Sequence, residues 1–134
     1  MGHRVENWPT VLADLVQENR DRAFEWGSFD CCIWPAMVKD SMTGSNLVEQ
    51  MAALYSDRAG ADKLIEDAGG FEELISQHLG EPVSAKLIGR GDVALIEHEN
   101  GKSLAIFDGQ YAIATGKNGL KMLKRSVILK GWKI

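Results

Sequence analysis

The spacing of apolar residues changes once along this sequence, close to Glu81 and Pro82. Before that point apolar residues recur at helical spacing, which is typical of helices packed on a core. After it they alternate with polar residues, and turn residues arrive at short intervals, as in antiparallel strands. The order predicts the α+β class, with helices over about residues 8–80 packed on one side of an antiparallel β-meander over about residues 85–134.

The first half carries several signals for helices. Pro9 suits a first helical turn. The apolar stripe that follows it consists of Val11, Leu12, Leu15 and Val16. Asn46 and Glu49 resemble a capping box, which predicts the start of another helix. Two shorter helices are expected near residues 60–68 and 70–79.

The second half predicts successive antiparallel strands joined by tight turns. The alternating segments are residues 91–98, 102–108, 110–115 and 120–125. The turn signals between them are Asn100-Gly101, Asp108-Gly109 and Asn118-Gly119.

Composition limits the organisation of the chain and its partners. With 134 residues, 45% hydrophobic and 25% charged, the sequence has the size and balance of a single globular domain over residues 1–134. The net charge of -4 argues against nucleic acid as a partner, since phosphate binding needs clustered Lys and Arg. No run is apolar enough to span a bilayer, and the N-terminal segment lacks a signal-peptide core, so we expect synthesis in a reducing cytoplasm.

The charge is distributed unevenly along the sequence. No acidic residue follows Asp108. The basic residues that follow it are Lys117, Lys121, Lys124, Arg125, Lys130 and Lys133. This basic segment predicts either a solvated strand face or a docking face for an acidic protein or an anionic polymer.

The two cysteines of the chain, Cys31 and Cys32, are adjacent. Neighbouring cysteines bond to each other only through a strained ring, so a structural disulfide framework is not expected. The three histidines, His3, His78 and His98, lack the spacing of zinc ligands. We therefore expect no metal and no other cofactor.

The cysteine pair precedes a predicted helix that ends near Gly44. Asp30 is a good N-cap, but a helix starting there would place Pro35 just past the first turn. We therefore expect the helix to begin one or two residues later, or with a distorted first turn. Cys31 then lies at or just before a helix N-terminus, where free N–H groups favour a thiolate. The alternative is a pair of small buried core cysteines.

Several segments together resemble a known superfamily by their order and spacing. They are "FEWGSFDC", "TG", "YSDRAGA", "GDVALI" and "GWKI". From Trp8 to Trp132 the chain is similar to the NlpC-like branch of papain-fold cysteine peptidases, and more closely to small phage and prophage proteins of that superfamily associated with tail assembly or the tail tip. The resemblance implies a papain-like fold in which the helix after Cys31 packs on a sheet beginning at Gly91-Asp92.

The resemblance also implies roles for individual residues. Cys31 takes the position of the nucleophile. In active members the strand after the "GD" strand begins with the catalytic histidine, and here the matching residue is Ser103. A serine does not accept a thiol proton at neutral pH, so the resemblance predicts impaired peptidase activity.

His98 offers a second source of a catalytic base. If Asn100-Gly101 forms a two-residue turn, Glu99 pairs with Lys102 and His98 lies opposite Ser103, on the same face of the hairpin. His98 then reaches toward the nucleophile from the neighbouring strand. The alternative is a solvent-exposed histidine at a hairpin tip, and a register slip of one residue would turn His98 to the opposite face.

Further residues have predicted supporting positions. Trp26 and Trp34 flank Cys31, and two positions are open for them. They line a substrate groove, or they belong to the core, which is the commoner place for buried aromatic residues near a helix start. Gly27 is expected in the tight turn that directs the cysteine helix. Asp92 is expected to hydrogen-bond the turn before its strand. By the resemblance, Tyr111 lies near where active relatives carry a third polar residue that orients the histidine.

Two functions follow from these expectations. In the first, the chain is a structural tail-assembly or tail-tip protein that binds other phage tail proteins and becomes part of the virion tail. In the second, it is a cysteine peptidase that cleaves peptidoglycan peptides, with Cys31 as nucleophile and His98 as base and then acid. A third hypothesis is an α+β domain unrelated to phage tails, and Cys32 favours it because a second thiol has no evident catalytic use.

Overall fold

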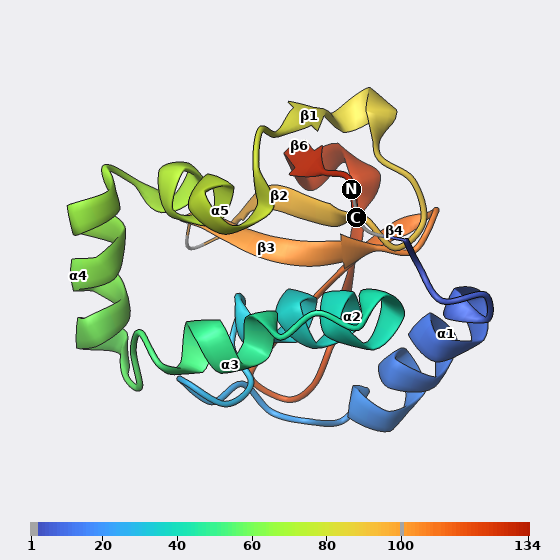
Figure 1. The fold of residues 1–134 in the computed structure, drawn as a ribbon, viewed down its shortest axis with the longest axis horizontal. Helices are drawn as coiled ribbons and strands as arrows, with labels where there is room; N and C mark the ends of the chain where they lie inside the picture. The colour runs from blue at the N-terminus through green and yellow to red at the C-terminus, as the bar shows by residue number, and fades with distance from the viewer. Residues whose placement is uncertain (1–2, 100) are drawn as a thin grey trace.

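The computed structural model describes residues 3–99 and 101–134, and in this part of the chain five α-helices precede a six-stranded antiparallel sheet (Figure 1). The helices are α1 (Trp8–Asn19), α2 (Ile33–Thr43), α3 (Leu47–Ala52), α4 (Arg58–Ala68) and α5 (Phe71–Leu79). The strands are β1 (Val83–Ser84), β2 (Val93–His98), β3 (Gly101–Phe107), β4 (Tyr111–Ala114), β5 (Lys121–Lys124) and β6 (Ile128–Trp132). The predicted α+β class is confirmed.

The sheet has the order β1-β6-β2-β3-β4-β5. Strands β2 to β5 form the expected meander, in which each strand pairs with the next one along the chain. The last strand departs from it, because β6 returns to pair with β2 instead of continuing beyond β5. The short strand β1 then pairs with β6 at the edge of the sheet. The alternating pattern predicted the meander and missed both of these strands.

Apolar side chains are buried on both faces of the sheet. Figure 1 shows α1, α2 and α3 along one side of the sheet, with α5 between the sheet and α4. Between these helices and the sheet lies a cluster that includes Leu12, Trp34, Met42, Leu95 and Ile106. Alternate residues of the same strands form a second cluster on the other face, including Ala94, Ile96, Ala105, Phe107 and Ile128. Both faces of the central strands are therefore buried.

Helix α2 begins later than Asp30, as the position of Pro35 predicted. Its first residue is Ile33, and the carboxylate of Asp30 accepts hydrogen bonds from the N–H groups of Cys32 (3.0 Å) and Ile33 (2.9 Å). Pro35 consequently lies in the first turn, where a backbone N–H has no acceptor within the helix. The helix ends at Gly44, whose φ of 77° confirms the expected glycine C-cap.

The predicted capping box at α3 is wrong, although the helix starts where expected. Within the described chain, the Asn46 side chain caps no helix N–H group. The carboxylate of Asp40, from α2, instead accepts hydrogen bonds from Leu47 N (2.8 Å) and Val48 N (2.9 Å). A carboxylate from the preceding helix satisfies these two N–H groups, so the local pattern was not needed.

Asp92 joins the two ends of the described chain. Its side chain is fully buried and lies 2.8 Å from the Arg4 guanidinium and 2.6 Å from the Lys133 ammonium. It also accepts hydrogen bonds from the N–H groups of Gly89 (2.8 Å) and Ile134 (2.9 Å). The expected hydrogen bond to the turn before β2 is confirmed, and the two ion pairs are an addition to it.

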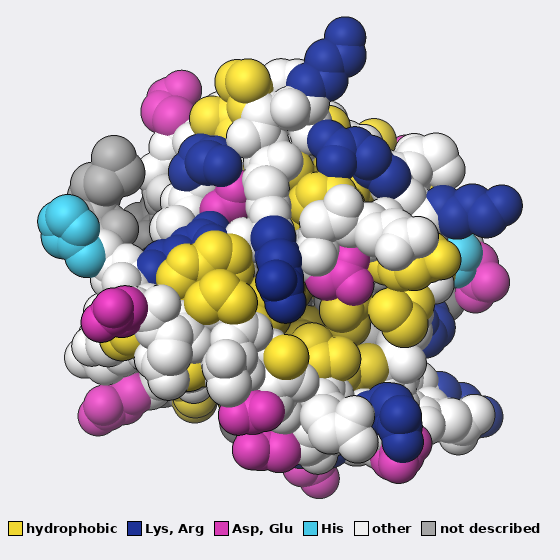
Figure 2. Space-filling view, turned by 90° about the vertical axis from the view of Figure 1, so that its right-hand side faces the viewer, with side chains coloured by type: hydrophobic (Ala, Val, Ile, Leu, Met, Phe, Trp, Pro, Cys, Tyr) yellow, Lys and Arg dark blue, Asp and Glu magenta, His cyan; other side chains and the backbone are white. Residues whose placement is uncertain are grey.

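The basic C-terminal segment is partly used within the fold. Lys130 pairs with Glu72 at 3.2 Å, and Lys133 pairs with Asp92. The Arg125 guanidinium lies 4.7 Å from the centre of the Phe107 ring. Figure 2 shows Lys and Arg side chains over the upper half of the face that is turned to the right in Figure 1, with hydrophobic side chains between them. In the described residues, no helix has the length and apolar character needed to cross a membrane.

Candidate functional site

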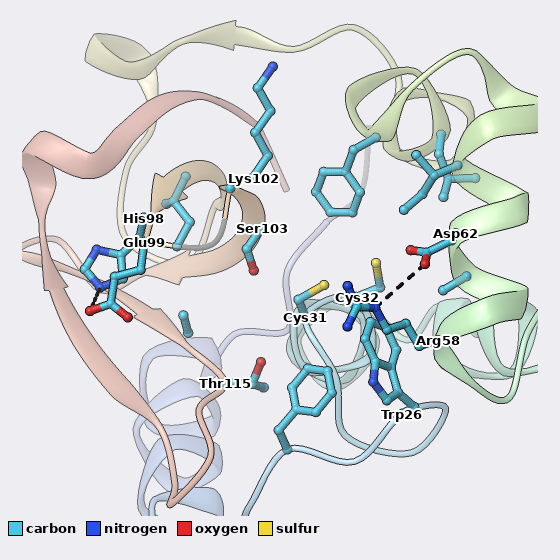
Figure 3. A pocket seen from close by; sticks show the side chains of 18 of the residues that line it. Trp26, Cys31, Cys32, Arg58, Asp62, His98, Glu99, Lys102, Ser103 and Thr115 are labelled. Carbon is cyan, nitrogen blue, oxygen red and sulfur yellow. Dashed lines mark ion pairs between the residues drawn. The ribbon is translucent and has the colours of Figure 1, made fainter.

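Cys31 lies in a cleft of about 960 Å³ at the turn end of the β2–β3 hairpin (Figure 3). His98 and Ser103 line the hairpin side of the cleft. Arg58 of α4 and Trp26, from the segment before α2, line other parts of it. Since catalytic and ligand sites concentrate in large concave pockets, this cleft is the candidate functional site.

Asp30 fixes the turn that carries Cys31. Its carboxylate is fully buried and accepts hydrogen bonds from Gly27 N (2.9 Å), the two N–H groups at the start of α2, and the Tyr55 hydroxyl (2.8 Å). Gly27 has a φ of +81°, and a Cβ atom there would lie 3.0 Å from the Ser56 backbone. The expected tight turn is confirmed, and Asp30 binds the N–H groups at the start of α2 although the N-cap residue is Cys32.

Cys31 carries the more acidic thiol of the adjacent pair. Its side chain is half-buried and faces the cleft. A hydrogen bond from the Cys32 thiol is the main cause that lowers the pKa of Cys31, and hydrogen bonds from the Ser103 hydroxyl and the Leu104 N–H add to it. Burial and the charge of Asp30 oppose this lowering.

Cys32 shows the opposite behaviour. The same interaction with Cys31, together with burial, raises the pKa of Cys32 well above its ordinary value. Cys32 is 8% exposed and belongs to the apolar core, but it also lines the cleft. The interaction between the two thiols therefore favours the thiolate at Cys31 and the protonated thiol at Cys32.

The strand β3 presents Ser103 to Cys31. Figure 3 shows the Ser103 hydroxyl directed toward the Cys31 sulfur. The His98 ring lies farther along the hairpin, and its Nε2 atom is 3.5 Å from a carboxylate oxygen of Glu99. Ser103 is thus the hydrogen-bond donor to the thiolate, while His98 shares the cleft without facing the sulfur.

The predicted register of the β2–β3 hairpin is wrong by two residues. His98 pairs with Gly101, and Ile96 pairs with Ser103, so the turn starts at Glu99. Position 100, which the predicted two-residue turn used, lies outside the described residues. Because side chains alternate with a period of two, His98 stays on the same face as Ser103 despite the shift.

The two tryptophans beside Cys31 have different environments. Trp26 lines the cleft, is 36% exposed, and packs edge-to-face on Phe24 with ring centres 4.9 Å apart. Trp34 is fully buried and donates a hydrogen bond from Nε1 to the carbonyl of Ile113 (3.0 Å). The core position expected for both residues is therefore confirmed for Trp34 and not for Trp26, which has the groove position.

Thr115 lines the cleft, whereas Tyr111 was the residue expected near the site. Tyr111 pairs with Lys124 at the start of β4 and is not among the described residues that line the cleft. Thr115 directly follows β4, is 9% exposed and lines the cleft. Antiparallel pairing sets the start of β3 against the end of β4, so this register was the signal that could have found Thr115.

The arrangement can supply a nucleophile and a binding surface. The Cys31 sulfur lies beside hydrogen-bond donors just before the start of α2, where the thiolate form is stabilised. An ion pair between Arg58 and Asp62 (3.7 Å) contributes charged groups to the wall. Among the described residues, no group of three or more His, Cys, Asp and Glu side chains could hold a metal ion.

Comparison with known proteins leads to a family without an assigned activity. No curated protein and no solved structure matches this chain. One family model does match, over residues 3–134. It covers both the helical half and the sheet, including the whole cleft around Cys31. The chain therefore belongs to the family described as domain of unknown function DUF6950.

Proposed function

We propose that this chain is a papain-like, NlpC-like domain that acts as a structural protein in phage or prophage tail assembly or at the tail tip. In this proposal the cleft around Cys31 binds a partner segment and does not cut it. The observation that carries the proposal is the position of Ser103, whose hydroxyl faces Cys31 where a peptidase needs a base.

The chemistry of peptide hydrolysis supports the absence of turnover. After a thiolate attacks a peptide bond, the leaving amine must gain a proton, and a water molecule must then lose one to release the acyl group. A serine hydroxyl does neither at neutral pH. Loss of one member of a catalytic pair removes most of the rate, while a fold can persist and serve another function.

The lining of the cleft supports a binding role. Phe24, Trp26 and Phe71 supply aromatic surface, and Trp26 is partly exposed. Partly exposed aromatic side chains are enriched where proteins bind each other. A segment of another tail protein is the proposed occupant, and the tail setting itself comes from the resemblance of the sequence.

Two measurements test the structural proposal. Tail proteins expressed with wild-type chain or with Cys31→Ala should assemble equally, and the chain should be present in purified particles at a defined stoichiometry. Peptidoglycan peptides incubated with either protein should remain intact to the same extent. Cleavage by the wild type that Cys31→Ala abolishes would overturn the proposal, as would particles that lack the chain.

A cysteine peptidase is the second candidate, and the placement of His98 favours it. His98 lines the same cleft as Cys31 and lies on the same face of the hairpin as Ser103. The test is the alkylation rate of Cys31 by iodoacetamide from about pH 5 to about pH 9. Peptide mapping separates Cys31 from Cys32.

The matched variants for this test are His98→Ala and His3→Ala. A base at His98 predicts that Cys31 alkylation at neutral pH slows in His98→Ala and is unchanged in His3→Ala, whose histidine is exposed and outside the cleft. Equal rates in all three proteins would exclude His98 as the base and leave the structural proposal standing.

A further inference from the structure

The two cysteines face the same cleft. Figure 3 shows both sulfur atoms on the cleft side of the turn that precedes α2, and both residues line the cleft. Both thiols are free. A structural tail protein uses neither thiol, and a peptidase uses only one of them, so the pair itself is left without a role.

The surroundings of Cys31 suit one type of thiol chemistry. The Cys32 thiol, the Ser103 hydroxyl and the Leu104 N–H all donate toward its sulfur, which stabilises the anion without a proton-accepting partner. Reactions with peroxides need this property, because the thiolate attacks directly. A cysteine that is partly accessible and beside a second thiol is typical of redox-sensitive sites.

We propose that Cys31 and Cys32 form a peroxide-sensitive dithiol, in which Cys31 reacts with the oxidant and Cys32 resolves the product. This role does not depend on the proposed tail function.

The chemistry proceeds in two balanced steps. In the first, the Cys31 thiolate attacks a hydroperoxide oxygen, the O–O bond breaks, and with proton uptake the products are Cys31 sulfenic acid and the corresponding alcohol, or water from hydrogen peroxide. In the second, the Cys32 sulfur attacks the Cys31 sulfur, an S–S bond forms, and the sulfenic oxygen leaves as water with the Cys32 proton. The hydroperoxide gains two electrons, and the two thiols lose them.

The disulfide formed by this pair must change the local structure. A disulfide requires sulfur atoms about 2.05 Å apart, and adjacent residues reach this distance only through a strained ring. In the reduced protein the Cys32 N–H donates to Asp30 Oδ1 at 3.0 Å, so distortion of this peptide weakens the hydrogen bonds that hold the start of α2. Oxidation therefore loosens the start of α2 at the cleft, and thiols readily reverse a strained bond.

The test treats the native wild-type protein with hydrogen peroxide and counts thiols by mass spectrometry. We expect the loss of both thiols in a monomer, a mass decrease of about 2 Da, and full recovery after dithiothreitol. Cys32→Ser should stop at the first step, and dimedone should label its Cys31. In Cys31→Ser the buried Cys32 should react much more slowly than Cys31 does in Cys32→Ser.

Three outcomes would overturn the proposal. The first is accumulation of sulfinic acid on Cys31 while Cys32 stays available for alkylation. The second is a disulfide between two chains in place of a bond within one. The third is wild-type protein that keeps both thiols at peroxide concentrations that oxidise the exposed control variant Ser126→Cys in a Cys31→Ser/Cys32→Ser background. The wild-type measurements stand even if the variants fold poorly.

Discussion

The hydroxyl of Tyr55 lies 2.8 Å from each of the two carboxylate oxygens of Asp30, across 25 residues of sequence. Tyr55 follows α3, and Asp30 accepts a hydrogen bond from the first residue of α2, so this contact connects the two helices beside the cleft. Burial raises the pKa of Tyr55, which keeps its hydroxyl protonated and able to donate. Asp30, which precedes Cys31, is thus held by the start of α2 and by Tyr55.

Tyr55→Phe should destabilise the fold by about 2 kcal/mol, because Asp30 would lose a hydrogen bond to a buried carboxylate. The free energy of unfolding in urea measures the effect. Tyr111→Phe is the matched control and should change it by less than about 0.5 kcal/mol, since Tyr111 is only half-buried on β4. Equal effects of the two substitutions would contradict the importance of the Tyr55 contact.

Ser103→Ala should slow alkylation of Cys31 at neutral pH by a factor of about five, the effect of one lost hydrogen bond on the thiolate. The sign follows from the Ser103 hydroxyl lowering the pKa of Cys31, so its loss moves the pH profile to higher pH. Unchanged alkylation would show that the hydroxyl does not stabilise the thiolate.

Ser103→His should have the opposite effect, because an imidazolium at this position stabilises the thiolate and moves its pH profile to lower pH. Iodoacetamide alkylation of Cys31 should therefore be faster at neutral pH than in the wild type. Ser126→His adds a histidine at an exposed position outside the cleft and should leave the rate unchanged. A slower or unchanged rate in Ser103→His would argue against a papain-like site.

Gly27→Ala should destabilise the fold by more than Gly44→Ala does. Both glycines have positive φ, at +81° and +77°, so both substitutions carry the cost of the left-handed region, about 1 kcal/mol. Only at Gly27 would the new Cβ meet the Ser56 backbone, at 3.0 Å, whereas no described atom lies within 4 Å at Gly44. Thermal unfolding midpoints measure the difference, and equal losses would remove the steric argument.

Arg4→Met should destabilise the fold by about 2 kcal/mol, because it leaves the buried carboxylate of Asp92 with only one cationic partner. Arg58→Met removes an exposed pair with Asp62 and should change the free energy of unfolding by less than about 1 kcal/mol. Urea unfolding of both variants provides the comparison. A larger loss in Arg58→Met would reverse this ranking.

Local patterns predicted the elements of this fold well. The switch from helical to alternating spacing anticipated α1 to α5 and the meander, and the difficulty with Pro35 anticipated the start of α2. These features depend on residues close together in the sequence, where backbone geometry and hydrogen bonding are read directly.

Relationships between distant residues were not predictable in the same way. The cap that Asp40 provides for α3 replaced a plausible local box, and β6 paired with β2 instead of β5. The hairpin placed its turn at Glu99, one residue earlier than the Asn-Gly rule suggested, which moved the partner of His98 from Ser103 to Gly101. Side chains and strands compete for such partners in the folded chain. The candidate site therefore depends on pairings between residues that are far apart in the sequence, and a short segment does not reveal them.

Asp92 directly precedes β2 and binds Arg4, which also contacts Ile134. His98, the last residue of β2, lines the cleft. The two ends of the described chain therefore meet at the opposite end of this strand from the cleft. Six residues of strand extend over about 20 Å. A tether attached near either terminus would hold the molecule by its far end and leave Cys31 directed outward. Immobilised protein thus offers a direct route to capturing whatever enters the cleft.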